Sequence, residues 1–382
     1  MGRWNLLRLV PRSTLFHVLR NNRNRGTALL RALSYELDEK LPPAWSVTSK
    51  PDDGGRGGRS GVSLILTAPD GTTATVLVEA RRVVEPRDVT SVLKQLTSYR
   101  DESDGDAVLM VAAPFLSPRA RELLEDAGAG WFDATGNLRL RIDRPSVFLD
   151  RVGASRNPFT DADDRRLKSL KGPGAARVVR ALLDAATPFG VRALADVAEV
   201  GAATSSRVLE LLAREDLVAR DKGGGVVEVR KLSLARRWCM DYGLTSTNQA
   251  VPMLAARGID QVVSALGRAD STYAITGEVA TRPYLPRGRA AVAPVALLTV
   301  FVPDATAAAA ALRVRPVDRG ANVVLVEPFD AVVFRGAVVK DGLTYAAASQ
   351  VVADLLTGTG RAPEEGAALI DALADQDVGW TG

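Results

Sequence analysis

Residues 191–229 read VRALADVAEVGAATSSRVLELLAREDLVARDKGGGVVEV, and this stretch decides the middle of the chain. Apolar residues recur at three- and four-residue spacing on both sides of Gly201, which predicts two amphipathic helices joined by a tight turn. A third helical pattern precedes them at 175–186, and residues 217–229 predict a hairpin with a glycine-rich tip. Together these features predict a winged helix-turn-helix over residues 173–230.

The second helix of this pair suits the reading of DNA. Thr204 and Ser205 at its start are small and allow close approach to a groove, and a helix N-terminus binds phosphate through its N–H groups. Arg207 follows on the polar face, within reach of a base edge or a phosphate. The hairpin brings Arg220 and Lys222 toward the DNA backbone. The expected DNA-binding residues are therefore Thr204, Ser205, Arg207, Arg214, Arg220 and Lys222.

The distribution of charge also favours DNA. The chain has 382 residues and a formal net charge of +4. The net charge is +3 for residues 1–149, +5 for 150–240 and −4 for 241–382. The most basic segment thus contains the predicted winged helix, as a surface that meets phosphate requires. A small helical domain used for protein contacts or dimerisation is the alternative interpretation.

The scarcity of cysteine and histidine excludes several kinds of site. Cys239 is the single cysteine and His17 the single histidine, which argues against a disulfide, a thiolate zinc site and Ser-His-Asp catalysis. We expect packing or surface roles for both, and neither a metal nor a cofactor. The sequence has no apolar run long enough for a membrane span and no secretory signal pattern. A cytoplasmic, nucleoid-associated location without membrane contact is expected.

The first part of the chain predicts an α/β domain over residues 1–150, because strand and helix patterns alternate. Apolar runs at 62–67 and 75–80 flank Pro69-Asp70-Gly71, which is typical of a hairpin. Ser117 followed by proline predicts the start of a helix. Further predicted elements are a helix at 88–99 and strands at 107–112, 131–133 and 138–142.

Residues 75–81, with the helix and strand that follow, resemble the core of the PD-(D/E)xK restriction-endonuclease-like superfamily. The resemblance covers roughly residues 30–145 and implies that an Asp and the Glu of a Glu-x-Lys strand hold a divalent metal. Glu79 matches the Glu, but Arg81 stands at the lysine position and keeps its proton near neutral pH. Ser63 stands near the place of the expected Asp.

We therefore predict a degenerate nuclease fold that is retained for DNA contact or dimerisation, with Glu79 paired to an arginine. Its phosphate-facing residues would be Arg81, Arg82, Arg87 and Lys94. The rival interpretation is a Mg²⁺-dependent nuclease centred on Glu79, acting in phage defence and delivered to DNA by the winged helix.

The last part predicts a second α/β domain over residues 242–382. Its expected elements are strands at 273–276, 295–302 and 323–326, a hairpin partner near 331–334, and helices at 349–356 and 363–374. Gln350 and Asp354 lie four residues apart on one helix face, where such side chains pair or cap rather than catalyse.

Residues 173–382 resemble the AbiEi antitoxin-type regulators of bacterial abortive-infection and type IV toxin–antitoxin systems. The matching residues are LARRW at 234–238, Asp241-Tyr242, YAITG at 273–277, Ala280, Asn322-Val323, Glu327-Pro328, Gln350, DLL at 354–356 and Gly360-Arg361. The resemblance implies a transcriptional regulator, and some relatives have a nucleotidyltransferase-like C-terminal fold. That chemistry needs paired carboxylates on a strand. Residues 297–302 contain none and Asp304 stands alone, so we expect a catalytically silent fold.

These observations predict a multidomain α/β protein that binds specific double-stranded DNA sequences as a transcriptional regulator and is not an enzyme. A homodimer and a protein partner at the C-terminal domain are expected. Besides the nuclease, a type IV antitoxin that acts mainly through protein interaction is an open alternative.

Overall fold

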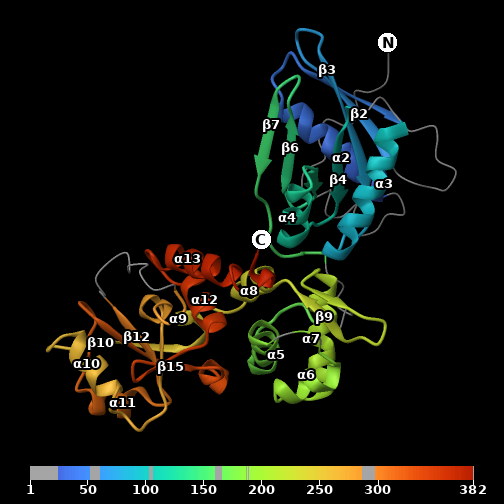
Figure 1. Ribbon diagram of the computed structural model, residues 1–382. Coiled ribbons are helices and arrows are strands. Elements are labelled where there is room, and N and C mark those ends of the chain that lie inside the picture. Colours follow the sequence, from blue (N-terminus) through green and yellow to red (C-terminus); the bar gives the residue numbers. More distant parts are fainter. Residues whose placement is uncertain are drawn as a thin grey trace. The chain divides into compact units, whose positions relative to one another are not determined.

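The computed structural model describes residues 25–51, 61–102, 106–159, 166–185, 187, 189–285 and 297–381. The chain falls into two compact units, Met1–Arg165 and Arg166–Gly382. His17 and the glycine-rich stretch at 52–60 lie outside the described residues. The described residues form helices and three β-sheets, which confirms the predicted mixed α/β class in outline (Figure 1).

The first unit is built around a seven-stranded sheet with the order β1-β2-β3-β4-β5-β6-β7. The strands are β1 Ser46–Pro51, β2 Gly61–Thr67, β3 Thr73–Ala80, β4 Val108–Ala113, β5 Gly130–Asp133, β6 Leu138–Ile142 and β7 Val147–Arg151. The pairs β3–β4 and β4–β5 are parallel, and the other neighbours are antiparallel. The predicted β2–β3 hairpin is confirmed, with Thr72 N donating to Asp70 Oδ1 at 2.9 Å in its turn.

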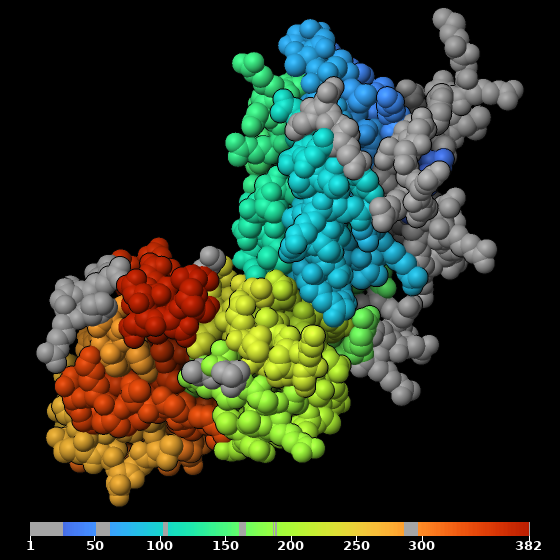
Figure 2. All heavy atoms as spheres, turned by 45° about the vertical axis from the view of Figure 1, so that its right-hand side comes forward, coloured from blue at the N-terminus to red at the C-terminus, as the bar shows by residue number. Residues whose placement is uncertain are grey.

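Helices cover both faces of this sheet, because successive strand residues point to opposite faces and both faces are apolar. The helices are α2 Arg25–Lys40, the 3₁₀ helix η1 Pro86–Asp88, α3 Val89–Glu102 and α4 Pro118–Asp126. α2 packs Leu29, Leu33 and Leu37 into a core with Val78. α3 and α4 pack on the opposite face, which contains Leu77. α3 forms much of the outer surface of this unit in the view of Figure 2.

The second unit begins with helices followed by a hairpin. Its first elements are α5 Pro173–Asp184, α6 Val191–Val197, α7 Ala202–Arg214, β8 Val218–Arg220, β9 Val226–Val229 and α8 Lys231–Cys239. β8 and β9 pair antiparallel. Phe189, which lies between α5 and α6, exchanges two backbone hydrogen bonds with Val226 of β9, at 2.9 and 2.8 Å. This bridge ties the segment before α6 to the hairpin after α7.

The rest of the second unit surrounds a seven-stranded mixed sheet with the order β13-β10-β14-β12-β11-β16-β15. Its strands are β10 Gln249–Leu254, β11 Ala274–Thr276, β12 Leu298–Phe301, β13 Arg315–Pro316, β14 Val323–Glu327, β15 Val338–Lys340 and β16 Leu343–Tyr345. Its helices are α9 Leu244–Thr247, α10 Ile259–Leu266, η2 Glu278–Thr281, α11 Ala305–Leu312, η3 Ala331–Phe334, α12 Ala348–Leu356, α13 Ala362–Ala374 and η4 Val378–Trp380.

One prediction in this region is wrong. The residues near 331–334 were expected to form a hairpin strand, but they form the short helix η3. Asp330 starts this helix, because its side chain accepts a hydrogen bond from Val332 N at 2.9 Å. The hairpin lies further on and joins β15 to β16. A capping aspartate outweighed the strand propensity of the valines that follow it.

One apolar core extends through the second unit. It contains Val178 of α5 and Leu212 of α7 together with Phe301 of β12 and Val351 of α12. The segment 173–230 therefore shares its core with the residues that follow it. None of the described helices combines the length and the apolar character that a membrane crossing needs.

Candidate nucleic-acid interface

α7 has a buried inner face and an exposed outer face. Its inner face contains Val208, Leu211 and Leu212, each no more than 3% exposed, as the predicted amphipathic helix requires. On the outer face, residues 201–203 and Arg207 are exposed. A helix of this kind can lay its outer face on another surface without disturbing the core.

The prediction that Ser205 contacts DNA is wrong. Its side chain is 0% exposed, and its Oγ has no hydrogen-bond partner among the described residues. Ser205 precedes Val208 by three residues and Leu212 by seven, which places it on the inner face of α7. Its neighbour Thr204 is half-buried and Arg207 is exposed, so these two remain as candidates for reading a groove.

Arg207 and Lys222 are the predicted contacts that reach solvent most freely. Arg207 Nε donates to the carbonyl of Ala203 one turn earlier, at 3.2 Å, so the side chain runs along the outer face of α7. Lys222 is exposed at the tip of the β8–β9 hairpin. That tip is a tight turn, because Gly225 N donates to Asp221 Oδ1 at 2.8 Å.

Arg214 and Arg220 have partners within the protein. One Nη of Arg214 donates to the carbonyl of Leu167 at 2.6 Å, which ties the segment before α5 to the end of α7. Arg220 Nε donates to the carbonyl of Gly224 at 2.9 Å and so braces the hairpin tip. DNA contact by these two residues stays a prediction, and it requires the donors that these bonds do not use.

Several arginines of residues 150–240 are held in ion pairs within the protein. These pairs are Arg177–Asp330, Arg180–Asp184, Arg230–Asp216, Arg237–Glu215 and Arg237–Asp241. The exposed charged residues on α6, α7 and the hairpin are of both signs: Arg192, Asp196, Glu199, Arg207, Glu210, Asp221, Lys222 and Glu228. Asp330 and Asp241 lie outside residues 150–240, so these two carboxylates offset positive charge that the net charge of the segment counts in full.

The turn that precedes α7 is held from far along the chain. Arg335, which follows η3, donates to the carbonyl of Val197 and to Oε1 of Glu199. Arg177 of α5 donates to both carboxylate oxygens of Asp330, at 3.0 and 2.9 Å, and to the carbonyl of Glu199. Glu199 has a φ of 51°, in the left-handed region. These contacts hold the end of α6 and the turn after it against α5 and the segment around η3.

Arg180 of α5 is fully buried and joins α5 to the C-terminal part of the unit. Its guanidinium donates to the side chains of Asp184, Ser349 and Gln350 and to the carbonyls of Val332 and Arg335, at 2.8–3.2 Å. A buried charge is tolerated only when its donors are satisfied in this way. No sequence signal identified it, because all its partners except Asp184 lie about 150 to 170 residues away.

A second buried cluster lies next to this one through Gln350. Asp354 is buried and accepts hydrogen bonds from Tyr242, Thr276 and Gln350, at 2.6, 2.5 and 2.9 Å. The predicted pairing of Gln350 with Asp354 is confirmed. Burial raises the pKa of Asp354 to about 6, although these hydrogen bonds act to lower it.

In the first unit, Glu79 and Arg81 form an ion pair. Glu79 Oε1 lies 2.8 Å from Arg81 Nε, and the predicted pairing of Glu79 with an arginine is confirmed. Glu79 is 3% exposed, and its Oε2 has no hydrogen-bond partner among the described residues. Across the β2–β3 ladder Gly61 lies opposite Glu79, and Ser63 lies opposite Leu77.

Two further residues of α3 belong to this site, and neither was among the predicted residues. One Nη of Arg81 donates to Gln95 Oε1 at 2.7 Å, and Gln95 Nε2 donates to the Tyr99 hydroxyl at 3.0 Å. Gln95 and Tyr99 are four residues apart and therefore share one face of the helix. The four-residue spacing of a glutamine and a tyrosine, on the helix that follows the Glu79 strand, is the sequence feature that could have identified these two residues.

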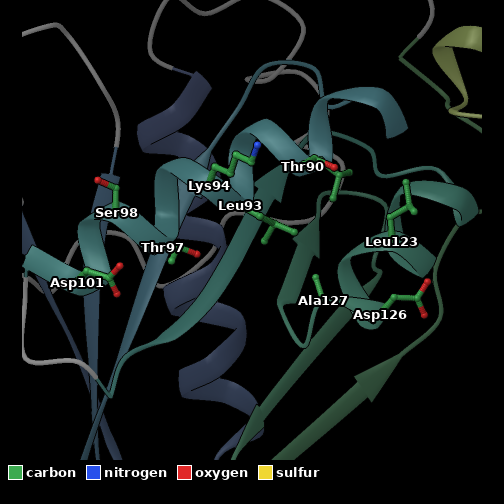
Figure 3. A pocket seen from close by; sticks show the side chains of 10 residues that line it. Thr90, Leu93, Lys94, Thr97, Ser98, Asp101, Leu123, Asp126 and Ala127 are labelled. Carbon is green, nitrogen blue, oxygen red and sulfur yellow. The ribbon is translucent and has the colours of Figure 1, made fainter. Parts of the chain in front are cut away.

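A shallow groove of about 650 Å³ lies between α3 and α4 in the first unit (Figure 3). Its lining mixes apolar residues such as Leu93 and Leu123 with Lys94, Asp101 and Asp126. Glu79 and Arg81 do not line it, so the groove and the ion pair are separate features of this unit.

No protein-family model and no curated protein matches this chain. Among solved structures, the chain is similar to EndoMS in its apo form, with 22% sequence identity and a TM-score of 0.20. The matched region covers 27% of this chain and spans 44% of that chain, less than half of its length.

Proposed function

We propose that this protein is a sequence-specific double-stranded DNA-binding regulator that acts without catalysis. The observation that carries the proposal is the order of α5, the Phe189 bridge, α6, α7 and the β8–β9 hairpin, with the outer face of α7 exposed. This order is that of a winged helix-turn-helix, in which the second helix of the pair enters the major groove.

The dimensions of α7 suit this role. Its 13 residues make a rod of about 20 Å, which fits along a major groove about 12 Å wide. Arg207 would read a base edge, with Thr204 close to the sugar-phosphate chain. Lys222 at the hairpin tip would contact an adjacent phosphate. The contacts of Arg335 and Arg177 would hold the turn before α7 in place and so reduce the entropy lost on binding.

The remainder of the second unit would serve as a regulatory and partner-binding module. The AbiEi-type resemblance suggests a transcriptional regulator, with a homodimer as the binding form. A twofold dimer would favour palindromic sites with half-sites about one helical turn apart. A protein partner at residues 242–382 and association with the nucleoid belong to the same proposal.

The Mg²⁺-dependent nuclease is the weaker candidate, because Glu79 is paired with Arg81. A cation at 2.8 Å from a carboxylate oxygen opposes the binding of a divalent ion at that carboxylate. Cleavage of duplex DNA with Mg²⁺ or Mn²⁺ that is lost in Glu79→Ala would nevertheless establish the nuclease.

Replacement of Arg207 tests the proposed reading residue. Arg207→Ala should weaken binding to a specific duplex by about 1–3 kcal/mol, because it removes a base contact. Ser205→Ala is the matched control on the same helix. It should leave affinity and stability unchanged, since the buried Oγ has no partner among the described residues. Fluorescence anisotropy with the full chain measures the duplex affinity of both variants. Equal affinities for the two variants would remove Arg207 from the interface.

Replacement of Lys222 tests the hairpin tip. Lys222→Ala should lower affinity by a similar factor for specific and nonspecific duplexes, because a phosphate contact carries no sequence information. The slope of log K against log salt should become shallower by about one. A salt titration of the variant that superimposes on that of the wild type would place the hairpin tip away from DNA.

A further inference from the structure

The nuclease resemblance of the first unit implies a divalent metal at Glu79, and the described residues do not fit one. Mg²⁺ and similar hard ions need several oxygen ligands. The described residues contain no group of three or more His, Cys, Asp or Glu arranged to hold a metal ion. The strand position opposite Glu79 is Gly61, which supplies no carboxylate.

Arg81 already neutralises Glu79. The two residues are separated by one position on an extended chain, so their side chains lie on the same face of the sheet. Arg81 Nε is 2.8 Å from Glu79 Oε1, and a positive charge at this distance takes the electrostatic role of a bound cation.

The Nε contact of Arg81 with Glu79 is an ion pair without a hydrogen bond among the described residues, and one Nη of the guanidinium is held by α3. One Nη donates to Gln95 Oε1 at 2.7 Å, and Gln95 is itself oriented by its bond to Tyr99. The other Nη makes no hydrogen bond to any residue that the structure describes, and the Arg81 side chain is 39% exposed. A rigid guanidinium with free donors at the surface is well suited to bind a phosphate oxygen pair.

The neighbouring surface adds positive charge. Arg82 follows Arg81 and is exposed, and Lys94 precedes Gln95 on α3 and is also exposed. Arg87 is 54% exposed and paired with Glu85, so it adds less positive charge to this surface.

We infer that Arg81 is a built-in cation that replaces a divalent metal at Glu79 and contacts a phosphate of duplex DNA. This inference rests on the proposed function, because it adds a phosphate contact in the first unit to the reading contact of α7. The site would bind DNA equally well in the absence of divalent ions.

The first experiment is a titration of the full chain with Mn²⁺, in which electron paramagnetic resonance measures the free ion. The wild type should show no site with a Kd below about 1 mM. Arg81→Lys should show none either, because Gly61 supplies no second carboxylate. A submillimolar Mn²⁺ site in the wild type that disappears in Glu79→Gln would overturn the inference.

The second experiment measures duplex affinity of the full chain in EDTA. Arg81→Gln should weaken binding about three- to tenfold and make the salt slope shallower by about one. Arg141→Gln is the matched control, since Arg141 is a 74% exposed arginine of the same unit that pairs with Asp143. Arg81→Lys keeps the positive charge and should bind duplex DNA more tightly than Arg81→Gln. It serves as the second test variant if Arg81→Gln perturbs folding.

The outcomes separate this inference from the proposed function. Equal affinities for Arg81→Gln and Arg141→Gln, with binding still sensitive to Arg207→Ala, would overturn the inference alone. Sensitivity to Arg81→Gln without sensitivity to Arg207→Ala would support the inference and contradict the proposed role of α7. A wild-type chain that binds no duplex would overturn both.

Discussion

Arg180→Met is expected to lower the free energy of unfolding of the second unit by about 3–5 kcal/mol, the largest loss for any single substitution considered. The variant removes the guanidinium but leaves its acceptors inside the protein. Those of Gln350, Val332 and Arg335 would lose a charged donor, and Asp184 would lose its ion-pair partner. Buried acceptors without a donor cost more than the original bonds contributed.

The measurement is urea-induced unfolding combined with hydrogen exchange of α5 and α12, so that the second unit is followed by itself. Arg192→Met is the matched control, because Arg192 is an exposed arginine on α6. Its effect should stay within about 0.5 kcal/mol. Arg180→Lys should also be destabilising, since an ammonium group cannot reach all the acceptors that the guanidinium joins. A loss for Arg180→Met no larger than that for Arg192→Met would contradict the role assigned to this residue.

Asp354 is expected to make the stability of the second unit depend on pH. Burial raises the pKa of Asp354 from 3.8 to about 6 in the folded protein. The folded state therefore binds this proton more tightly than the unfolded state does. Stability from this group is fully present below pH 4 and is lost as the pH rises to about 6. The shift corresponds to about 3 kcal/mol.

Asp354→Asn isolates this effect, because asparagine has nearly the same shape and does not titrate. The unfolding free energy of the wild type minus that of Asp354→Asn should fall by about 2 kcal/mol between pH 4 and pH 6.5. Taking the difference removes the contribution of the other titrating groups. A difference that stays constant over this range would show that Asp354 titrates alike in the folded and unfolded chain.

Local features of the first unit followed from the sequence. The hairpin around Asp70 and the helix that starts after Ser117 both depend on contacts between residues close in the chain. Thr72 N donates to Asp70, and Ala120 N donates to the Ser117 side chain at 3.2 Å. Short-range signals of this kind are read directly from residue type and spacing.

Features that depend on distant residues did not follow from the sequence. The burial of Arg180 and the hydrogen bond from Arg335 to the end of α6 depend on which elements meet in the fold. Residues 331–334 were predicted as a strand from their valines, because the capping of a helix by Asp330 was not recognised.

The candidate interface was predicted in part, because residue type alone does not show which side chains are buried or paired. Ser205 was assigned to the DNA surface from its residue type, while its spacing from Val208 and Leu212 already placed it on the inner face. The net charge of residues 150–240 leaves out Asp330 and Asp241, which lie outside this segment and pair with Arg177 and Arg237. Arg207 and Lys222 are exposed, as contact with DNA requires.

α7 is proposed to read DNA sequence. Selection from a random duplex pool by the full chain at low salt, with wild type and Arg207→Ala in parallel, tests this role. The wild type should enrich a defined motif, and Arg207→Ala should lose preference at one or more of its positions. Failure of the wild type to enrich any motif would contradict the claim.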